Sequence, residues 1–136
     1  MASIHREISI DAPPEQVWSA LRDVGALHTR VAPGFVIDTK LEEGARVVTF
    51  GNGMVARELI VDVDDAARRI AWAAVGTRMT HHNASFQVFA EQGQTRGVWI
   101  ADLLPHDMAP GVTAMIEQGL AAMKRTMEDA AAAKLR

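Results

Sequence analysis

Apolar and polar residues alternate over several stretches of this chain, which is the pattern of half-buried β-strands. The first stretch, residues 3–11, places Ile4, Ile8 and Ile10 on one face. Six further strands are predicted, separated by short turns rich in Gly, Asn and Asp, at residues 35–41, 46–50, 54–64, 68–75, 79–91 and 95–104. Connections this short favour antiparallel hairpins over crossovers.

Helical spacing replaces the alternation in two regions. After the first strand, Pro14 suits the opening turn of a helix, and Val17 and Leu21 then lie one turn apart. A second short helix is predicted for residues 26–31. Beyond Pro105, a long helix is predicted from about residue 107 or 110 to the C-terminus.

The long helix carries an apolar stripe at spacings of three and four. Its members are Val112, Ile116, Leu120, Met123 and Met127. One face of the predicted sheet must be covered, and only this helix is large enough to cover it. The order of elements therefore predicts an α+β fold in which a curved antiparallel sheet of about seven strands wraps around the C-terminal helix.

Length and composition agree with one compact unit. The chain has 136 residues, of which 49% are apolar, so we expect a single domain over residues 1–136 with a sizeable core. Many of the apolar residues are alanine, which fills little volume. This composition is a first indication of an internal hollow.

Charge and residue usage narrow the classes of function. The formal net charge is −3 with no basic block, which is not the footprint of a nucleic-acid binder. No segment approaches the ~20 apolar residues of a membrane span, and the charged N-terminal residues do not resemble a signal peptide. The chain has no cysteine. We therefore expect a cytoplasmic protein with no membrane insertion and no thiolate chemistry.

Several segments carry a resemblance to a known superfamily. They are residues 12–18 (Ala-Pro-Pro-Glu-Gln-Val-Trp), Asp23, the strand and turn at 58–65, and the final amphipathic helix. Together with the order of elements, they resemble the START-like (SRPBCC) superfamily of the helix-grip fold, and most of all its bacterial polyketide cyclase/dehydrase and lipid-transport group. The stretches around Glu58, Val75-Gly76 and residues 82–85 are also similar to plant abscisic-acid receptors. The resemblance implies a bacterial protein with a hydrophobic cavity between the concave sheet face and the long helix, without choosing among carriers, receptors and cyclases.

Strand alternation then predicts which residues line that cavity, once the resemblance places Glu58 on its wall. The expected ligand-binding set from the strands is Glu58, Trp72, His81, Asn83, Ser85, Gln87 and Asp102. The long helix is expected to add Met115, Gly119 and Met123, although ordinary core filling explains the methionines equally well. A slip of one residue would turn each strand set to the opposite face.

Glu58 is the most informative single residue of this set. On a cavity wall, its carboxylate could hold a polar group of the ligand or act as a general base with a raised pKa. The alternative is a structural partner for Arg46, Arg57 or Arg69, or a solvent-exposed strand position.

The row of polar residues at alternate positions 81, 83, 85 and 87 also has two interpretations. It could supply the directional contacts that orient a ligand in an apolar pocket. It could equally form a polar outer face, with Phe86 and Val88 pointing inward.

Metal, cofactor and nucleophile chemistry have little support. His81 and His82 are adjacent on a strand and point to opposite faces, so they cannot chelate one ion together. No serine lies in a GxSxG turn, and the glycines at 51 and 53 belong to a hairpin rather than to a phosphate loop. His106 is either a residue of the cavity mouth or an exposed loop histidine. We expect no metal and no cofactor.

Three functions remain open. The first is binding or transport of a small hydrophobic molecule, such as a lipid, a polyketide or an aromatic compound, without turnover. The second is a cyclase or dehydrase that uses Glu58 with His81 or Asp102 as acid and base. The third is a protein-interaction module with a collapsed cavity. A homodimer is compatible with all three.

Overall fold

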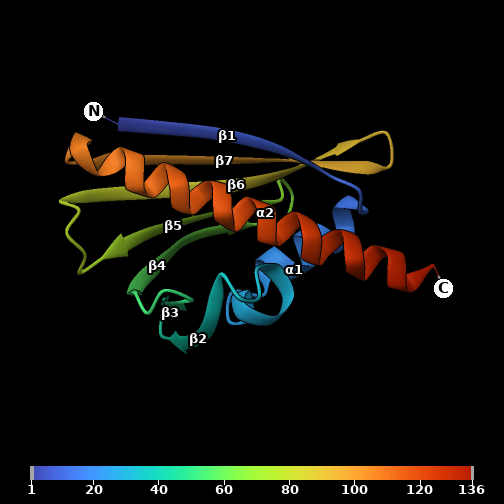
Figure 1. Ribbon diagram of the computed structural model, residues 1–136. Helices are drawn as coiled ribbons and strands as arrows, with labels where there is room; N and C mark the ends of the chain where they lie inside the picture. Colours follow the sequence, from blue (N-terminus) through green and yellow to red (C-terminus); the bar gives the residue numbers. More distant parts are fainter. Residues whose placement is uncertain (1, 136) are drawn as a thin grey trace.

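Seven strands form one antiparallel sheet in the computed structural model, which describes residues 2–135. A long helix crosses the concave face of this curved sheet (Figure 1). The strands are β1 (Ala2–Ile10), β2 (Val36–Glu42), β3 (Ala45–Phe50), β4 (Val55–Asp64), β5 (Arg69–Val75), β6 (His81–Glu91) and β7 (Gln94–Leu104). The helical elements are α1 (Pro14–Arg22), the turns η1 (Leu27–Val31) and η2 (His106–Met108), and the long α2 (Ala109–Lys134). The predicted α+β helix-grip architecture is confirmed.

The strand order is β1-β7-β6-β5-β4-β3-β2, with every neighbouring pair antiparallel. Strands β2 to β7 follow one another as hairpins, and β1 pairs with β7 at the far edge. The turn between β6 and β7 consists of Gln92 and Gly93, whose φ angles are +52° and +82°. Two positive φ angles in a two-residue loop match the twist of the flanking strands.

Helix α2 packs on the sheet through the predicted stripe. Ile116, Leu120, Met123 and Met127 are each at most 5% exposed, while the charged side chains of the helix lie mainly at its outer surface. Gly119 lies in the same stripe, and its missing side chain leaves space for the rings of Phe35 and Trp99. Burial of the stripe therefore stabilises the packing of the helix on the core, and β1 is the strand that it contacts most.

The two segments after β1, α1 and η1, each contact both the sheet and α2. Val17 of α1 is fully buried, and the indole N–H of Trp18 donates to Asp65 Oδ1 at 2.9 Å, which ties α1 to the β4–β5 turn. The predicted helix at 26–31 is a five-residue π-helical turn, η1, which contacts both β2 and α2. These contacts place η1 between the β2 edge and the long helix.

Strands β5 and β6 separate toward one end of the sheet. Their pairing ends at Trp72 and Ala84, although β5 continues to pair with β4 as far as Val75. Beyond that point, the N–H of Ala74 donates to Nδ1 of His82 at 2.9 Å instead of to a backbone carbonyl of β6. A histidine ring thus occupies the gap between the two strands.

Candidate functional site

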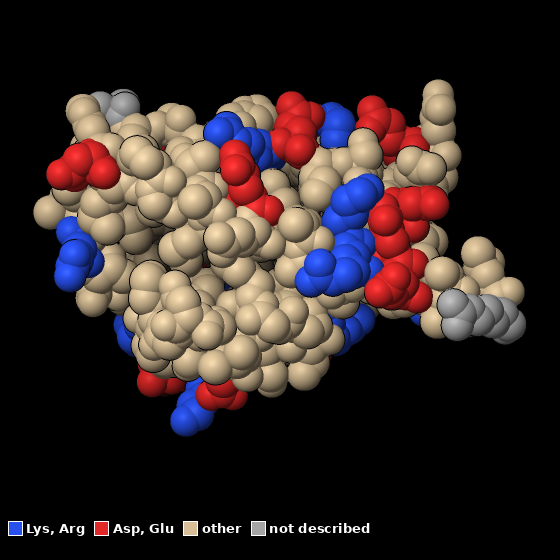
Figure 2. Space-filling view, viewed as in Figure 1, with Lys and Arg blue, Asp and Glu red and all other residues tan. Residues whose placement is uncertain are grey.

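A cavity of about 920 Å³ lies between the concave face of the sheet and the helices α2 and η1. Strands β3 to β7 form one wall, and α2, η1 and Phe35 form the other. Figure 2 shows the surface hollowed beside α2, among side chains that are neither acidic nor basic. A space of this size is in the range of small-molecule sites.

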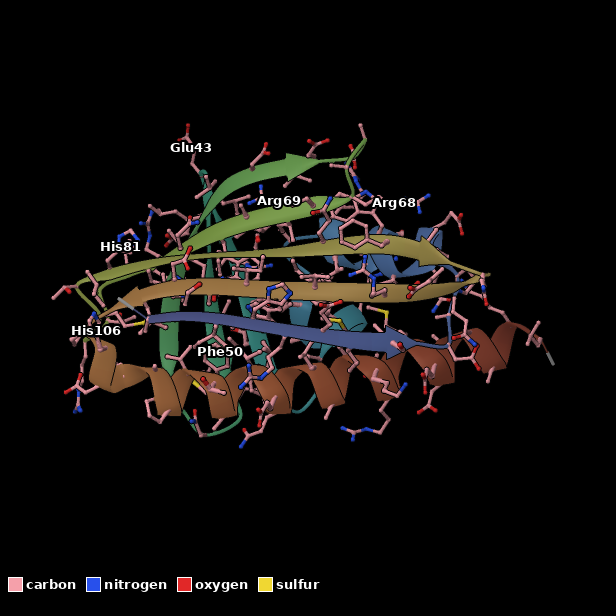
Figure 3. All side chains as sticks on the ribbon, turned by 90° about the horizontal axis from the view of Figure 1, so that it is seen from above. Glu43, Phe50, Arg68, Arg69, His81 and His106 are labelled. Atoms are coloured by element: carbon pink, nitrogen blue, oxygen red, sulfur yellow. The ribbon has the colours of Figure 1, made fainter. Side chains whose placement is uncertain are left out.

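Aromatic rings form much of the wall. The rings of Trp72 and Trp99 meet edge to face with centroids 5.7 Å apart, and Phe86 continues the cluster at 6.1 Å from Trp99. On the β3 side, Phe35 and Phe50 meet in the same manner at 5.4 Å. In Figure 3, Phe50 lies on the side of the sheet that faces α2. The two clusters give the cavity flat apolar surfaces.

Methionines complete the apolar lining. The cavity is bordered by Met54, Met79, Met108, Met115 and Met123. Thioether side chains are flexible and polarisable, so they adapt to ligands of different outline. The lining therefore combines rigid rings with adaptable side chains.

One ion pair is enclosed in the wall. Arg46 and Glu58 lie directly opposite each other on β3 and β4, and Nε of Arg46 donates to Oε1 of Glu58 at 2.9 Å. Their side chains are only 5% and 10% exposed. The guanidinium of Arg46 also lies 5.7 Å from the ring of Trp72 and donates to the carbonyl of Val24 at 3.4 Å. Arg46 is thus held by partners on three sides.

Burial governs the ionisation of Glu58. Desolvation raises the pKa of this carboxyl above its usual range, and the charge and hydrogen bond of Arg46 act in the opposite direction. The carboxylate is therefore retained in the wall at the cost of its solvation, and its charge depends on Arg46.

His82 presents a hydrogen-bond donor to the cavity. Because its Nδ1 accepts the N–H of Ala74, the neutral ring carries its proton on Nε2. Burial lowers the pKa of His82, and the neighbouring His81 adds to this effect. Both effects favour the neutral ring, whose Nε2–H has no hydrogen-bond partner among residues 2–135.

The mouth of the cavity lies where β5 and β6 separate. It is bordered by Thr77, Arg78 and Asp107, and by Met54 and Val55, which are 48% and 59% exposed. Charged groups thus lie at the opening, and the interior beyond it is apolar except for Arg46, Glu58 and His82.

Half of the predicted ligand-binding set lies on the cavity wall. These residues are Glu58, Trp72, Met115, Gly119 and Met123. Trp99 of β7 also lies on the cavity wall. Glu58 lines the cavity and is also the structural partner of Arg46, one of the three arginines expected for that role. Whether these residues bind a ligand stays a prediction.

The polar row on β6 lies on the outer face, so the expected cavity-facing orientation is wrong and the alternative, with Phe86 and Val88 pointing inward, is confirmed. His81, Asn83, Ser85 and Gln87 do not line the cavity, and the residues that face it are His82 and Phe86. The reason is the register between β5 and β6. Residues directly opposite each other in an antiparallel sheet share a face, and Trp72 lies opposite Ala84, so the even-numbered residues of β6 point inward.

The same shift corrects the prediction for β7. Ala84 pairs with Ala101, so Trp99 and Ala101 face the cavity and Asp102 points to the outer face. There, Asp102 Oδ1 accepts the hydroxyl of Ser3 at 2.6 Å. Neither Asp102 nor His81 can therefore meet Glu58 at one substrate, and these two acid–base pairs do not form. His106 is exposed in η2 and does not line the cavity.

Sequence reasoning missed two polar residues of the wall. Arg46 was named only as one of three partners for Glu58, and the pairing of β3 with β4 across the turn at residues 51–53 would have selected it. His82 was assigned to the outer face with the rest of its strand's even positions. Its bond to Ala74 depends on the separation of β5 from β6, for which the sequence holds no local signal.

Residues 2–135 contain neither a membrane-spanning helix nor a metal-binding cluster. No helix in this range combines the length and the apolar character needed to cross a membrane. The same residues contain no group of three or more His, Asp or Glu side chains that could hold a metal ion.

Comparison with known proteins gives a family match over most of the chain. The sequence model of the family described as polyketide cyclase / dehydrase and lipid transport matches residues 1–128. A search of curated protein sequences finds no match.

Solved structures share the fold at low sequence identity. The protein XoxI from Bacillus cereus has a TM-score of 0.83 at 19% identity, with 95% of this chain and 97% of that chain covered. An uncharacterized protein from Bacillus thuringiensis has a TM-score of 0.82 at 18% identity, with 93% and 98% covered. The di-domain ARO/CYC protein BexL, from the BE-7585A biosynthetic pathway, has a TM-score of 0.73 at 20% identity, with 94% of this chain and 47% of that chain covered. At these identities the likeness shows the fold alone.

Proposed function

Since the chain belongs to the polyketide cyclase/dehydrase and lipid transport family, we propose that it binds a small hydrophobic molecule between its sheet and α2. The observation that carries this proposal is the cavity of about 920 Å³ with its aromatic and methionine lining. A drug-sized apolar molecule would bury most of its surface there, which is the main source of affinity at such sites.

The contacts that we propose for the ligand follow from the geometry of the wall. Trp72 supplies a flat ring against the sheet, and Met115, Gly119 and Met123 supply an adaptable surface on α2. Glu58 contributes a carboxylate that is already held by Arg46. These five residues are our proposed ligand-binding set.

His82 selects the polar group of the ligand. Its Nε2–H is a donor in a largely apolar space, and a donor that a bound ligand covers costs free energy unless an acceptor of that ligand meets it. We therefore expect a ligand with a carbonyl or ether oxygen that can reach this ring.

The geometry favours binding over catalysis. Acid–base chemistry needs a group that is free to exchange a proton with the substrate. Glu58 is occupied by Arg46, and Nδ1 of His82 is occupied by Ala74, so each titratable group of the interior has a structural partner. We accordingly propose a carrier or a binding protein, and leave the similarity to BexL as one of fold.

Mass spectrometry of the purified protein tests this function. We would extract the denatured protein and measure any co-purified molecule, with native mass spectrometry for stoichiometry. The expected result is an apolar compound at close to one molecule per chain. A weak ligand can be lost during purification. We would therefore also incubate the protein with an extract of lipids and aromatic compounds and repeat the measurement.

Two neighbouring alanines of β5 give a matched pair of variants. Ala74 lines the cavity, whereas Ala73 lies on the opposite face of the same strand. We expect Ala74→Phe to abolish retention of the molecule and Ala73→Phe to leave it unchanged, because only the first ring fills the cavity. Equal retention by both variants, or no bound compound in either experiment, would contradict the proposal.

A further inference from the structure

The outer face of the sheet, which the proposed function does not use, has a recess of its own. It measures about 300 Å³ and lies over β1, β5, β6 and β7. Two members of the polar row on β6, Ser85 and Gln87, border it. The sheet itself separates this recess from the cavity, and Figure 3 shows Arg69, at its β5 side, away from α2.

Strand register places the residues of this recess in rows. Arg69 lies opposite Gln87, which lies opposite Val98. In the adjacent row, Ser85 lies opposite Ile100. Val98 and Ile100 therefore give the recess an apolar floor at its centre, and Arg69 stands at one side of it.

The positive charges of the recess are unequally matched. Arg96 at the far side donates to Glu7 at 2.7 Å and lies 4.5 Å from the ring of Phe89, so its charge is neutralised. The side chain of Arg69 forms no ion pair or hydrogen bond with any residue in the range 2–135. Asp64 lies opposite it on β4, but that carboxylate accepts the N–H of Ala67 at 3.0 Å instead. One guanidinium is left unpaired beside an apolar floor.

Ser85 offers a second polar group to the same space. The residue is only 8% exposed, and its hydroxyl makes no hydrogen bond to another described residue. It stands two positions along β6 from Gln87, the cross-strand neighbour of Arg69. Diagonal neighbours of this kind have Cα atoms roughly 7–8 Å apart, so one small group can contact both side chains.

We propose that this recess binds a small molecule that carries one carboxylate and an apolar body. The guanidinium of Arg69 matches a planar carboxylate through two parallel N–H bonds, and the hydroxyl of Ser85 donates a third. Val98 and Ile100 contact the apolar body. A single negative charge fits best, because Glu7 at the far side repels an anion of higher charge.

Titration of the full chain with sodium benzoate, followed by amide NMR shifts, tests this site. We expect saturable shifts for the amides of Ser85, Gln87 and Val98 on the outer face. Arg69→Gln should weaken the apparent affinity at least tenfold, and Ser85→Ala severalfold. The Ser85→Ala result decides the question if Arg69→Gln does not fold.

Arg57→Gln is the matched control, since Arg57 is an arginine of β4 that is already paired with Glu42 at 2.8 Å. It should leave the affinity unchanged. The proposal is overturned if Arg57→Gln weakens binding as much as Arg69→Gln does, which would indicate general surface charge. It is also overturned if the saturable shifts are confined to cavity residues such as Trp72 and Ala74, or if sodium phosphate binds as tightly as benzoate.

Discussion

Arg46 and Glu58 show how much a single charged residue of the wall depends on its neighbour. Each is almost fully enclosed, and each is the other's charged hydrogen-bond partner. A buried ion pair adds little net stability over an apolar pair, but removal of one member leaves an uncompensated charge in a poorly solvated place. The two residues should therefore behave as a unit.

Substitution tests this dependence. We expect Glu58→Gln to lower the free energy of unfolding by about 3–5 kcal/mol, because the guanidinium of Arg46 loses its counter-charge. The double variant Arg46→Met/Glu58→Leu should recover most of that loss. Urea denaturation measures both, and a double variant less stable than Glu58→Gln alone would show that the pair contributes stability of its own.

His82 gives the chain a dependence of stability on pH. Its pKa is lowered in the folded protein, so the unfolded chain binds this proton more readily. The free energy of unfolding should then be highest above the ordinary histidine pKa of about 6.5 and should fall as the pH decreases through it. Protonation of Nδ1 would also break the bond to Ala74.

The variant His82→Asn separates this effect from that of other groups. Its amide oxygen can accept the N–H of Ala74 but does not titrate, so the decrease in stability between about pH 7.5 and 5.5 should become smaller. His81→Asn, at the exposed neighbouring position, should keep most of the dependence, because burial is the larger cause of the lowered pKa of His82 and His81 the smaller one. Identical slopes for His82→Asn and the original chain would rule out this role.

At the scale of elements, the packing of Phe86 of β6 against the neighbouring strand β7 requires a glycine at position 97. A Cβ atom on Gly97 would lie 2.5 Å from Cζ of Phe86 and 3.4 Å from a methyl group of Ile8. Phe86 cannot move away easily, because it is 1% exposed and packs against Trp99. The close approach fixes how β1, β6 and β7 pack together.

Gly97→Ala should accordingly destabilise the protein by about 1–3 kcal/mol through overpacking. Gly111, in the first turn of α2, has no neighbour within 4 Å of such a Cβ, so Gly111→Ala should be neutral or stabilising by up to about 1 kcal/mol. Thermal or urea unfolding of the two variants compares them directly. Equal effects would mean that crowding by Phe86 is not the cause.

The positions of the strands and helices were the part of the structure that the sequence predicted best. Alternation and turn residues predicted every strand, because each depends on residues within about ten positions of one another. It was harder to predict which face of each strand points into the cavity, since that depends on the pairing with the neighbouring strand. The pairing of Trp72 with Ala84 determines which residues of β6 face the cavity. The sequence does not show how the β5–β6 connection sets this pairing, so the expected ligand-binding set had the polar row on the wrong face. The stripe of α2 needed no partner strand, and Met115, Gly119 and Met123 were placed correctly.

At the scale of the whole molecule, the cavity exists because sheet and helix are held apart at one end. Aromatic clusters and η1 border the cavity, while Leu120 and Met127 of the stripe, which do not line it, pack in the hydrophobic core. An unfilled apolar space forfeits contacts between its walls, so occupation should stabilise the fold.

A ligand that binds only the folded chain should stabilise it by RT ln(1 + [L]/Kd), about 2.7 kcal/mol at a hundredfold excess over Kd. We expect the neutral apolar fluorophore N-phenyl-1-naphthylamine to produce such a shift in urea unfolding and to quench Trp72 and Trp99. Ala74→Phe should remove the shift, and Ala73→Phe should retain it. A shift that persists in Ala74→Phe would place the fluorophore outside the cavity.

The opposition of Arg46 and Glu58 on adjacent strands also has an evolutionary meaning. A lineage that loses one charge first passes through an unstable intermediate, so single replacements at either position should be rare. Related sequences are expected to change both positions together, to an apolar pair or to a pair with the charges exchanged. Such a double replacement would change the size and polarity of the ligands that fit the cavity in one evolutionary step. Reconstructed ancestral sequences would show at which branch both positions changed.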